Sequence, residues 1–312
     1  MIWKEANKRF DEYGNDKVIG TNGFYAMKAH WSEHPDRDDT WAEAERARIG
    51  EERFRREHEC EFLIFDETLI NSIHLADMEG VTPVENTGQV RWFKRPTPGH
   101  TYLTSLDPSM GTGGDFAAIQ VFELPTYKQI AEWRHNTTPI PAQIRILKDI
   151  CNYIKECCSN DGQNIYWSVE NNSIGEGALI VIRDMGEENI PGMCVSEPIR
   201  KGHVRKFRKG FNTTHSTKIS ACTRLKNMVE NDKLTINSKV LVSELKAFVA
   251  SGSSFKAKPG ETDDLVSACL LSMRIMAVLK DWDPRVYETF NQADTGEDAT
   301  PPMPIFVSTN IR

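Results

Sequence analysis

The sequence lacks any long hydrophobic run. No apolar stretch among its 312 residues approaches the ~18 residues that a membrane-spanning helix needs. The N-terminal stretch MIWKEANKRFDEYG also has no apolar core of the kind found in secretory signal peptides. The sequence therefore predicts a protein that neither spans a membrane nor is secreted.

The sequence also lacks a CxxC cysteine motif and a P-loop nucleotide-binding motif. The seven cysteines are odd in number and none is spaced as CxxC, which argues against a disulfide framework and against structural zinc. A reducing cytosol is the compartment that this cysteine usage favours. There is no GxxxxGK[ST] motif either, so the chain carries no P-loop with which to bind ATP.

One segment has no acidic residues at all. The whole chain has a net charge of −7, from 38 basic and 45 acidic residues, which argues against a general nucleic-acid coat. From Pro198 to Val229, however, Asp and Glu are absent. The basic residues there that are candidates for phosphate-backbone contacts are Arg200, Lys201, Arg205, Lys206, Arg208, Lys209 and Lys218. A solvated surface loop is the alternative interpretation.

The composition divides the chain into four regions. Residues 1–80 carry a charged, helix-like segment with Asp39 or Thr40 as its N-cap, and they are few for a free-standing core. Residues 81–100 are rich in Pro and Gly and predict a linker with a short strand at Val90–Phe93. Residues 101–284 alternate strand-like and helix-like runs, which is typical of an α/β domain with a mixed sheet. Residues 285–312 predict a flexible tail.

The stretch from Thr101 to Glu123 is the centre of this α/β region. An apolar run ends on Asp107, a glycine-rich turn leads to Asp115, and a second apolar run starts at Phe116. Runs of this length bounded by Gly and Pro suit strands better than helices. A carboxylate at the end of a buried strand is rigid, and it can bind a hard divalent cation through its oxygens.

Other carboxylates follow the same pattern. Glu170 ends the predicted strand Asn164–Glu170, and Asp263 and Asp264 open the last apolar helix. Two divalent ions that clamp a phosphodiester need three or four carboxylates, one of them bridging. Asp107 is the natural bridging ligand, with Glu170 and Asp264 on either side, and Asp115 and Asp263 are auxiliary candidates. Taken singly, each has a simpler explanation as a turn residue, an exposed strand end or a helix N-cap.

These residues resemble the large terminase subunit of tailed bacteriophages, particularly the contractile-tailed kind. Leu106-Asp107 through Gly113, Gly114 and Asp115 is similar to the family's first nuclease motif. The second motif resembles Val169-Glu170-Asn171-Asn172-Ser173 with Gly175, and the third resembles Asp263-Asp264-Leu265-Val266. One position departs from the family pattern, because Thr262 stands where a His usually precedes the Asp pair.

The resemblance implies a fold and a chemistry. The fold would be an RNase H-like α/β domain, a mixed central sheet flanked by helices, with a small α-rich N-terminal segment. The chemistry would be phosphodiester hydrolysis with two Mg²⁺ or Mn²⁺ ions. The family pattern maps the essential acids onto Asp107, Glu170 and Asp264. Residues 1–80 resemble the end of the family's packaging ATPase domain without its ATP-binding motifs. This indicates the nuclease half of a large terminase, whether truncated or encoded as a split gene.

The resemblance also implies a biological setting. The substrate would be concatemeric double-stranded DNA, cut with little sequence preference, with the basic segment holding the DNA backbone. The partners would be a portal protein, the small terminase subunit and an ATPase domain or chain. The location would be the host cytoplasm at the procapsid vertex, and not the mature virion. Two alternatives remain: an RNase H-like resolvase or recombinase, and a non-catalytic docking module of the packaging motor.

Overall fold

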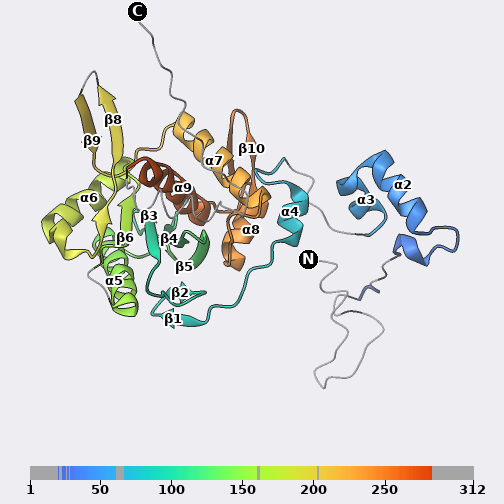
Figure 1. Ribbon diagram of the computed structural model, residues 1–312, viewed down its shortest axis with the longest axis horizontal. Helices are drawn as coiled ribbons and strands as arrows, with labels where there is room; N and C mark the ends of the chain where they lie inside the picture. The colour runs from blue at the N-terminus through green and yellow to red at the C-terminus, as the bar shows by residue number, and fades with distance from the viewer. Residues whose placement is uncertain are drawn as a thin grey trace, which may run out of the picture. The chain divides into compact units, whose positions relative to one another are not determined.

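The computed structural model describes residues 20, 23–25, 27, 29–60, 67–159, 162–201 and 204–282. The chain divides into two units, Met1–Phe65 and Asp66–Arg312, each of which is described by itself (Figure 1). Within the described residues, no helix is long and apolar enough to cross a membrane. The predicted tail at 285–312 lies outside the described residues.

The first unit contains a small aromatic core. Its elements are η1 (Trp31–Glu33), α2 (Asp39–Ile49) and α3 (Glu51–Glu57). The helix-like segment of the sequence is broken at Gly50, whose φ of 85° no helix accommodates. Asp38 is the N-cap of α2, in place of the predicted Asp39 or Thr40, because its Oδ1 accepts the backbone N–H of Trp41 at 2.8 Å.

The boundary between the units lies earlier than the sequence predicted. The backbone N–H of Leu69 donates to the carbonyl of Phe248, and that of Ala250 donates to the carbonyl of Glu67. Residues from Asp66 onward therefore belong to the second unit, and the predicted boundary at residue 80 moves to Phe65. Long-range pairing of this kind leaves no trace in local composition.

The second unit is built on a mixed seven-stranded sheet in the order β1-β2-β5-β4-β3-β6-β7. The strands β1 to β5 pair antiparallel, whereas β6 and β7 run parallel to β3. This confirms the predicted α/β fold with a mixed sheet. The strands are β1 (Glu85–Thr87), β2 (Val90–Trp92), β3 (Thr101–Asp107), β4 (Ala117–Leu124), β5 (Lys128–His135), β6 (Ile165–Val169) and β7 (Met193–Cys194).

The segment predicted as a linker, residues 81–100, contributes the strands β1 and β2 to this sheet. Arg91 pairs with Glu132 and Trp92 with Ala131, so β2 extends the sheet beyond β5. Trp92 is fully buried in the main hydrophobic core. The short strand predicted within this segment at Val90–Phe93 is observed as β2, Val90–Trp92.

Helices cover both faces of the sheet (Figure 1). Tyr102, Leu106 and Trp133 belong to the core that also takes in the apolar stripes of α5 and α6. Alternation along β3 places Ser105 and Asp107 on the opposite face, where Ser105 is bonded to α9. The helices are α4 (Ser72–Asp77), α5 (Ile140–Cys158), α6 (Ser173–Met185), α7 (His215–Glu230), α8 (Lys239–Ala247) and α9 (Asp264–Trp282), with a short η2 (Glu187–Asn189).

Two small ribbons complete the unit. β10 (Phe248–Ser251) and β11 (Ser254–Ala257) form one antiparallel hairpin. β8 (Glu197–Lys201) and β9 (Val204–Arg208) form another, which projects beyond the main sheet in Figure 1. The second ribbon carries Arg200, Lys201, Arg205, Lys206 and Arg208 of the acid-free segment, where the sequence predicted no strands.

Candidate active site

Asp107 and Glu170 stand side by side at the ends of neighbouring strands. β3 and β6 are parallel, and Leu106 lies opposite Val169 in their register. The backbone N–H of Glu170 donates to the carbonyl of Leu106 at 2.9 Å. Both carboxyl-bearing residues therefore leave the sheet at one edge, where parallel strand ends commonly present functional groups. Each is partly exposed above a buried backbone.

Asn172 and Gly175 hold Glu170 in place. Asn172 Nδ2 donates to Glu170 Oε2 at 2.9 Å, while Asn172 Oδ1 accepts the N–H groups of Ile174 and Gly175 at 3.1 and 2.9 Å. The same amide therefore caps α6 and binds the carboxylate. At Gly175, an added Cβ would lie 1.8 Å from the carbonyl oxygen of Glu170. From the sequence, Asn172 and Gly175 could be assigned to a motif but not given a physical role. A signal for Asn172 was present, however, because an Asn just before a helix is an N-cap signal.

The start of α9 brings the third acidic position to the same edge. α9 begins at Asp264 and packs across β3 and β4. Ser105 Oγ, two residues before Asp107, donates to the carbonyl of Ala268 at 2.7 Å and also lies 2.7 Å from Ser272 Oγ. These buried bonds fix how far along β3 the helix sits, and they set the position of Asp264 relative to Asp107.

The electrostatics show that these acids act on one another. Burial raises the pKa of Asp107 well above its ordinary value, followed by the charge and hydrogen bonding of Glu170 and by the charges of Asp264 and Asp263. Burial raises the pKa of Asp264 to about 6, and the charges of Asp263 and then Asp115 add to it. All five predicted acids therefore belong to one electrostatic cluster, although Asp115 lies on the exposed turn between β3 and β4.

The donor set suits a hard divalent cation, because it consists of carboxylate oxygens that repel one another in the absence of a counter-charge. The acids are not gathered around a common point, however. Within the described residues, no group of three or more His, Cys, Asp or Glu side chains is arranged so that it could hold a metal ion.

The predicted phosphate-contacting residues fall into two groups. Those on the β8–β9 ribbon have described backbones, but their side chains lie outside the described part: Arg200, Lys201, Arg205, Lys206 and Arg208. The ammonium group of Lys209 pairs with Glu187, and that of Lys218 lies 5.5 Å from the ring centroid of Phe248.

The base of the β8–β9 ribbon is hydrogen-bonded to Asn171, the residue next to Glu170. Asn171, next to Glu170, donates from Nδ2 to the carbonyl of Lys209 at 2.8 Å, and its N–H donates to the carbonyl of Phe211 at 2.7 Å. The N–H of Phe211 in turn donates to the carbonyl of Val169 at 3.1 Å. The base of the basic ribbon is thereby bonded to the end of β6.

The raised pKa of Asp264 predicts a pH-dependent stability for the metal-free protein. Its folded-state pKa of about 6 exceeds its ordinary value of 3.8, so the folded state binds a proton that the unfolded state has lost. This contribution is complete below pH 3.8 and is lost as the pH rises through about 6. We expect Asp264→Asn to gain stability relative to wild type across this window, by on the order of 1–2 kcal/mol after solvent screening. Urea unfolding in EDTA at pH 4 to 7 measures this, and a pH-independent difference would contradict it.

Comparison with known proteins places this geometry in a family. Residues 104–275 match the family model described as the terminase RNaseH-like domain. The large terminase nuclease from thermophilic phage G20c with bound magnesium is 17% identical, with a TM-score of 0.50 over 67% of this chain and 97% of that chain. The same nuclease with bound cobalt gives the same values. At this identity the two structures establish likeness of fold. The segment that the family model matches runs from within β3 to within α9, so it takes in the elements that carry the site. The chain belongs to the terminase RNaseH-like domain family.

Proposed function

We propose that this protein is a metal-dependent endonuclease of a viral genome-packaging terminase, which cuts concatemeric double-stranded DNA with little sequence preference. The observation that carries the proposal is the convergence of Asp107, Glu170 and Asp264 on one edge of the sheet, where burial and then the charges of Glu170 and Asp264 raise the pKa of Asp107. Ionised carboxylates held together in this way need a cationic partner at neutral pH. The magnesium and cobalt bound by the phage G20c nuclease support Mg²⁺ or Mn²⁺ in that role.

Each residue has a distinct part in the proposed mechanism. Asp107 would be shared between two ions, Glu170 and Asp264 would each complete one side, and Asp263 and Asp115 would add negative charge nearby. Divalent ions held there would supply Lewis-acid activation of the attacking water and neutralisation of the scissile phosphate. Asn172 would keep Glu170 oriented. The bonds from Ser105 to α9 would fix the position of α9 along β3, and with it the position of Asp264 relative to Asp107.

The β8–β9 ribbon is the proposed holder of the DNA backbone. It combines the acid-free sequence with an attachment beside Glu170, so DNA bound along it would pass the carboxylates. In the packaging setting, the partners would be a portal protein, the small terminase subunit and an ATPase, at the procapsid vertex in the host cytoplasm.

Neutralising the ribbon is expected to weaken DNA binding uniformly across sequences. The double variant Arg205→Ala/Lys206→Ala removes two of the positive charges proposed to contact phosphates, so the slope of log affinity against log salt should become shallower by about 2. Fluorescence anisotropy with two unrelated duplexes at several salt concentrations measures the slope. The matched control is Lys155→Ala/Lys148→Ala on α5, which should leave the slope unchanged. A wild-type affinity that does not vary with salt would refute the role of the ribbon.

Plasmid cleavage tests the proposed function directly. The wild-type chain should convert supercoiled plasmid to nicked and linear forms with Mg²⁺ or Mn²⁺, and EDTA should stop the reaction. Cleavage of unrelated plasmids at similar rates would agree with low sequence preference, whereas a strong preference for four-way junctions would favour the resolvase alternative. A folded protein that binds no Mn²⁺ in calorimetry and cuts under no condition would overturn the proposal in favour of a docking module.

A further inference from the structure

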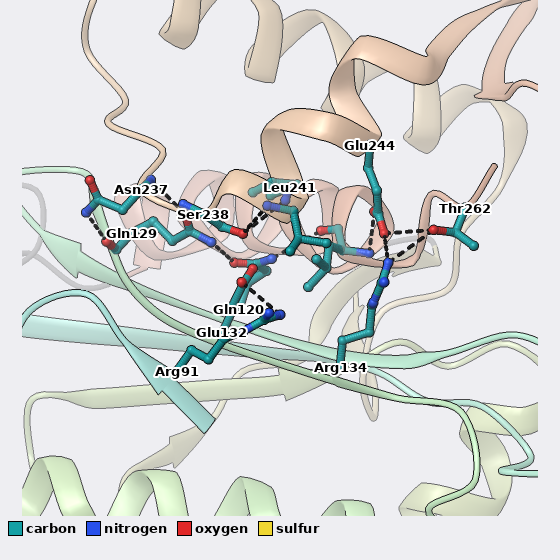
Figure 2. Close-up of polar contacts among 12 residues, drawn as sticks. Arg91, Gln120, Gln129, Glu132, Arg134, Asn237, Ser238, Leu241, Glu244 and Thr262 are labelled. Atoms are coloured by element: carbon teal, nitrogen blue, oxygen red, sulfur yellow. Dashed lines mark hydrogen bonds and ion pairs between the residues drawn. The ribbon is translucent and has the colours of Figure 1, made fainter. Parts of the chain in front are cut away.

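A single buried carboxylate binds the first turn of α9. Glu244 lies on α8, with 5% of its surface exposed. Its Oε2 accepts the backbone N–H of Leu265 at 2.9 Å and that of Val266 at 3.1 Å. These are two of the N–H groups that the start of a helix leaves without an intrahelical partner. The acceptor comes from another helix and not from a local cap residue (Figure 2).

The other oxygen of Glu244 belongs to a closed triangle of side chains. Thr262 Oγ1 donates to Glu244 Oε1 at 3.0 Å, and Arg134 Nη1 donates both to Glu244 Oε1 and, at 3.1 Å, to Thr262 Oγ1. Figure 2 shows the three side chains meeting between β5, α8 and the segment before α9. Thr262 is the position that departs from the family pattern, and here its hydroxyl joins the arginine to the glutamate.

Glu244 bonds the chain on both sides of the Asp263-Asp264 pair. Thr262 precedes the pair and Leu265 follows it, so Glu244 binds the chain immediately before and immediately after the acids. Arg134 also contacts Phe116, because its guanidinium lies 4.2 Å from the ring centroid of that residue. Burial raises the pKa of Asp264, and the backbone of Phe116 and the positive charge of Arg134 oppose that rise. The backbone at Asp264 is thus held through its neighbours.

Burial of this ion pair has a cost for stability. Desolvating a carboxylate and a guanidinium is unfavourable, and well-packed apolar residues in such places are often as stable. Burial raises the pKa of Glu244 to about 7 in spite of Arg134 and the hydrogen bonds to it. A buried carboxylate that accepts bonds from Thr262, Leu265 and Val266, all at one helix start, is better explained by the position it imposes than by stability alone.

We propose that Glu244 is a positioning residue which, through Thr262 and Arg134, sets the orientation of Asp264 for divalent-cation binding. The inference rests on the proposed function, because it assumes that Asp264 is a metal ligand. Residues that orient metal ligands through hydrogen bonds typically affect metal affinity or activity about 10- to 100-fold when replaced.

The test compares Glu244→Gln with Glu132→Gln. Glu132 provides a matched control because it is also buried, lies on β5 two residues from Arg134, and pairs with Arg91 at 3.0 Å without bonding α9. Mn²⁺ affinity is measured by isothermal titration calorimetry, stability by urea unfolding in EDTA, and kcat and KM by plasmid cleavage. We expect Glu244→Gln to weaken Mn²⁺ binding about 10- to 100-fold and lower kcat with little change in KM for DNA. Glu132→Gln should keep wild-type Mn²⁺ affinity, because the ion pair of Glu132 with Arg91 does not involve α9.

Thr262→Val covers the case in which Glu244→Gln does not fold. It keeps the side-chain shape and removes one hydroxyl from a partly exposed position, so it should remain folded and weaken Mn²⁺ binding severalfold. Wild-type Mn²⁺ affinity in folded Glu244→Gln, or in Thr262→Val if the former is unfolded, would overturn the inference and leave the nuclease proposal standing. An equal loss of affinity in Glu132→Gln would also overturn it, since the effect would then not be specific to the bonds between Glu244 and the start of α9. Absence of Mn²⁺ binding in the wild-type protein would overturn both.

Discussion

Replacing Asp107 by Asn is expected to abolish DNA cleavage and, at the same time, to stabilise the metal-free protein. The proposed shared ligand would lose the charge that holds two cations, so the cleavage rate should fall by about 10³-fold or more. Stability should rise at neutral pH because the variant no longer ionises a group whose pKa burial and Glu170 raise. The two effects have opposite signs, which distinguishes a functional carboxylate from one that supports the fold.

The Asp107 experiment pairs plasmid cleavage in Mn²⁺ with urea unfolding in EDTA. Asp184→Asn is the control, because Asp184 is an exposed aspartate on α6 that pairs with Arg183. It should cleave at the wild-type rate and have unchanged stability, since an exposed ion pair contributes little. A folded Asp107→Asn protein that retains cleavage would remove Asp107 from the mechanism. Loss of stability in the variant would instead indicate a structural carboxylate.

Replacing Gly175 by Ala is expected to have the second-largest effect, although Ala is normally the better helix former. The added Cβ would lie 1.8 Å from the carbonyl oxygen of Glu170, so the start of α6 or the end of β6 must move. Overpacking of this kind typically costs about 1–3 kcal/mol. Displacing Glu170 by even a fraction of an ångström should reduce cleavage by on the order of 10²-fold.

Gly177→Ala is the matched control on the same helix. Its Cβ would meet only Ile140 Cδ1, at 3.4 Å, so the substitution should be neutral or should stabilise the helix by about 0.5–1 kcal/mol. Thermal unfolding and plasmid cleavage of the two variants give the comparison. If Gly175→Ala cuts DNA and unfolds like Gly177→Ala, the close approach between α6 and Glu170 has no functional role.

Much of the fold could be predicted from the sequence because its signals are local. The apolar runs that form β3, β4, β5 and β6 each show strand patterning within a few residues, α5 carries helical periodicity over 19 residues, and α9 is a strongly apolar run of helical length. The acid-free segment was visible as composition, but its β8–β9 ribbon was not, since dense Arg and Lys residues obscure strand patterning. The pairing of β2 with β5 and of residues 67–69 with β10 joins segments far apart in the sequence, so local composition did not indicate it.

The candidate site shows the same division. The sequence alone determined which acids are available and that each ends a strand or begins a helix, because those features depend on neighbouring residues. Only the tertiary structure decided that Leu106 lies opposite Val169, and that Arg134 meets Glu244 across 110 residues of chain. Register and side-chain partnership are set by how whole strands and helices pack together, so no local pattern encodes them. The physical origin of the site is this packing, which holds like charges together at one edge of the sheet.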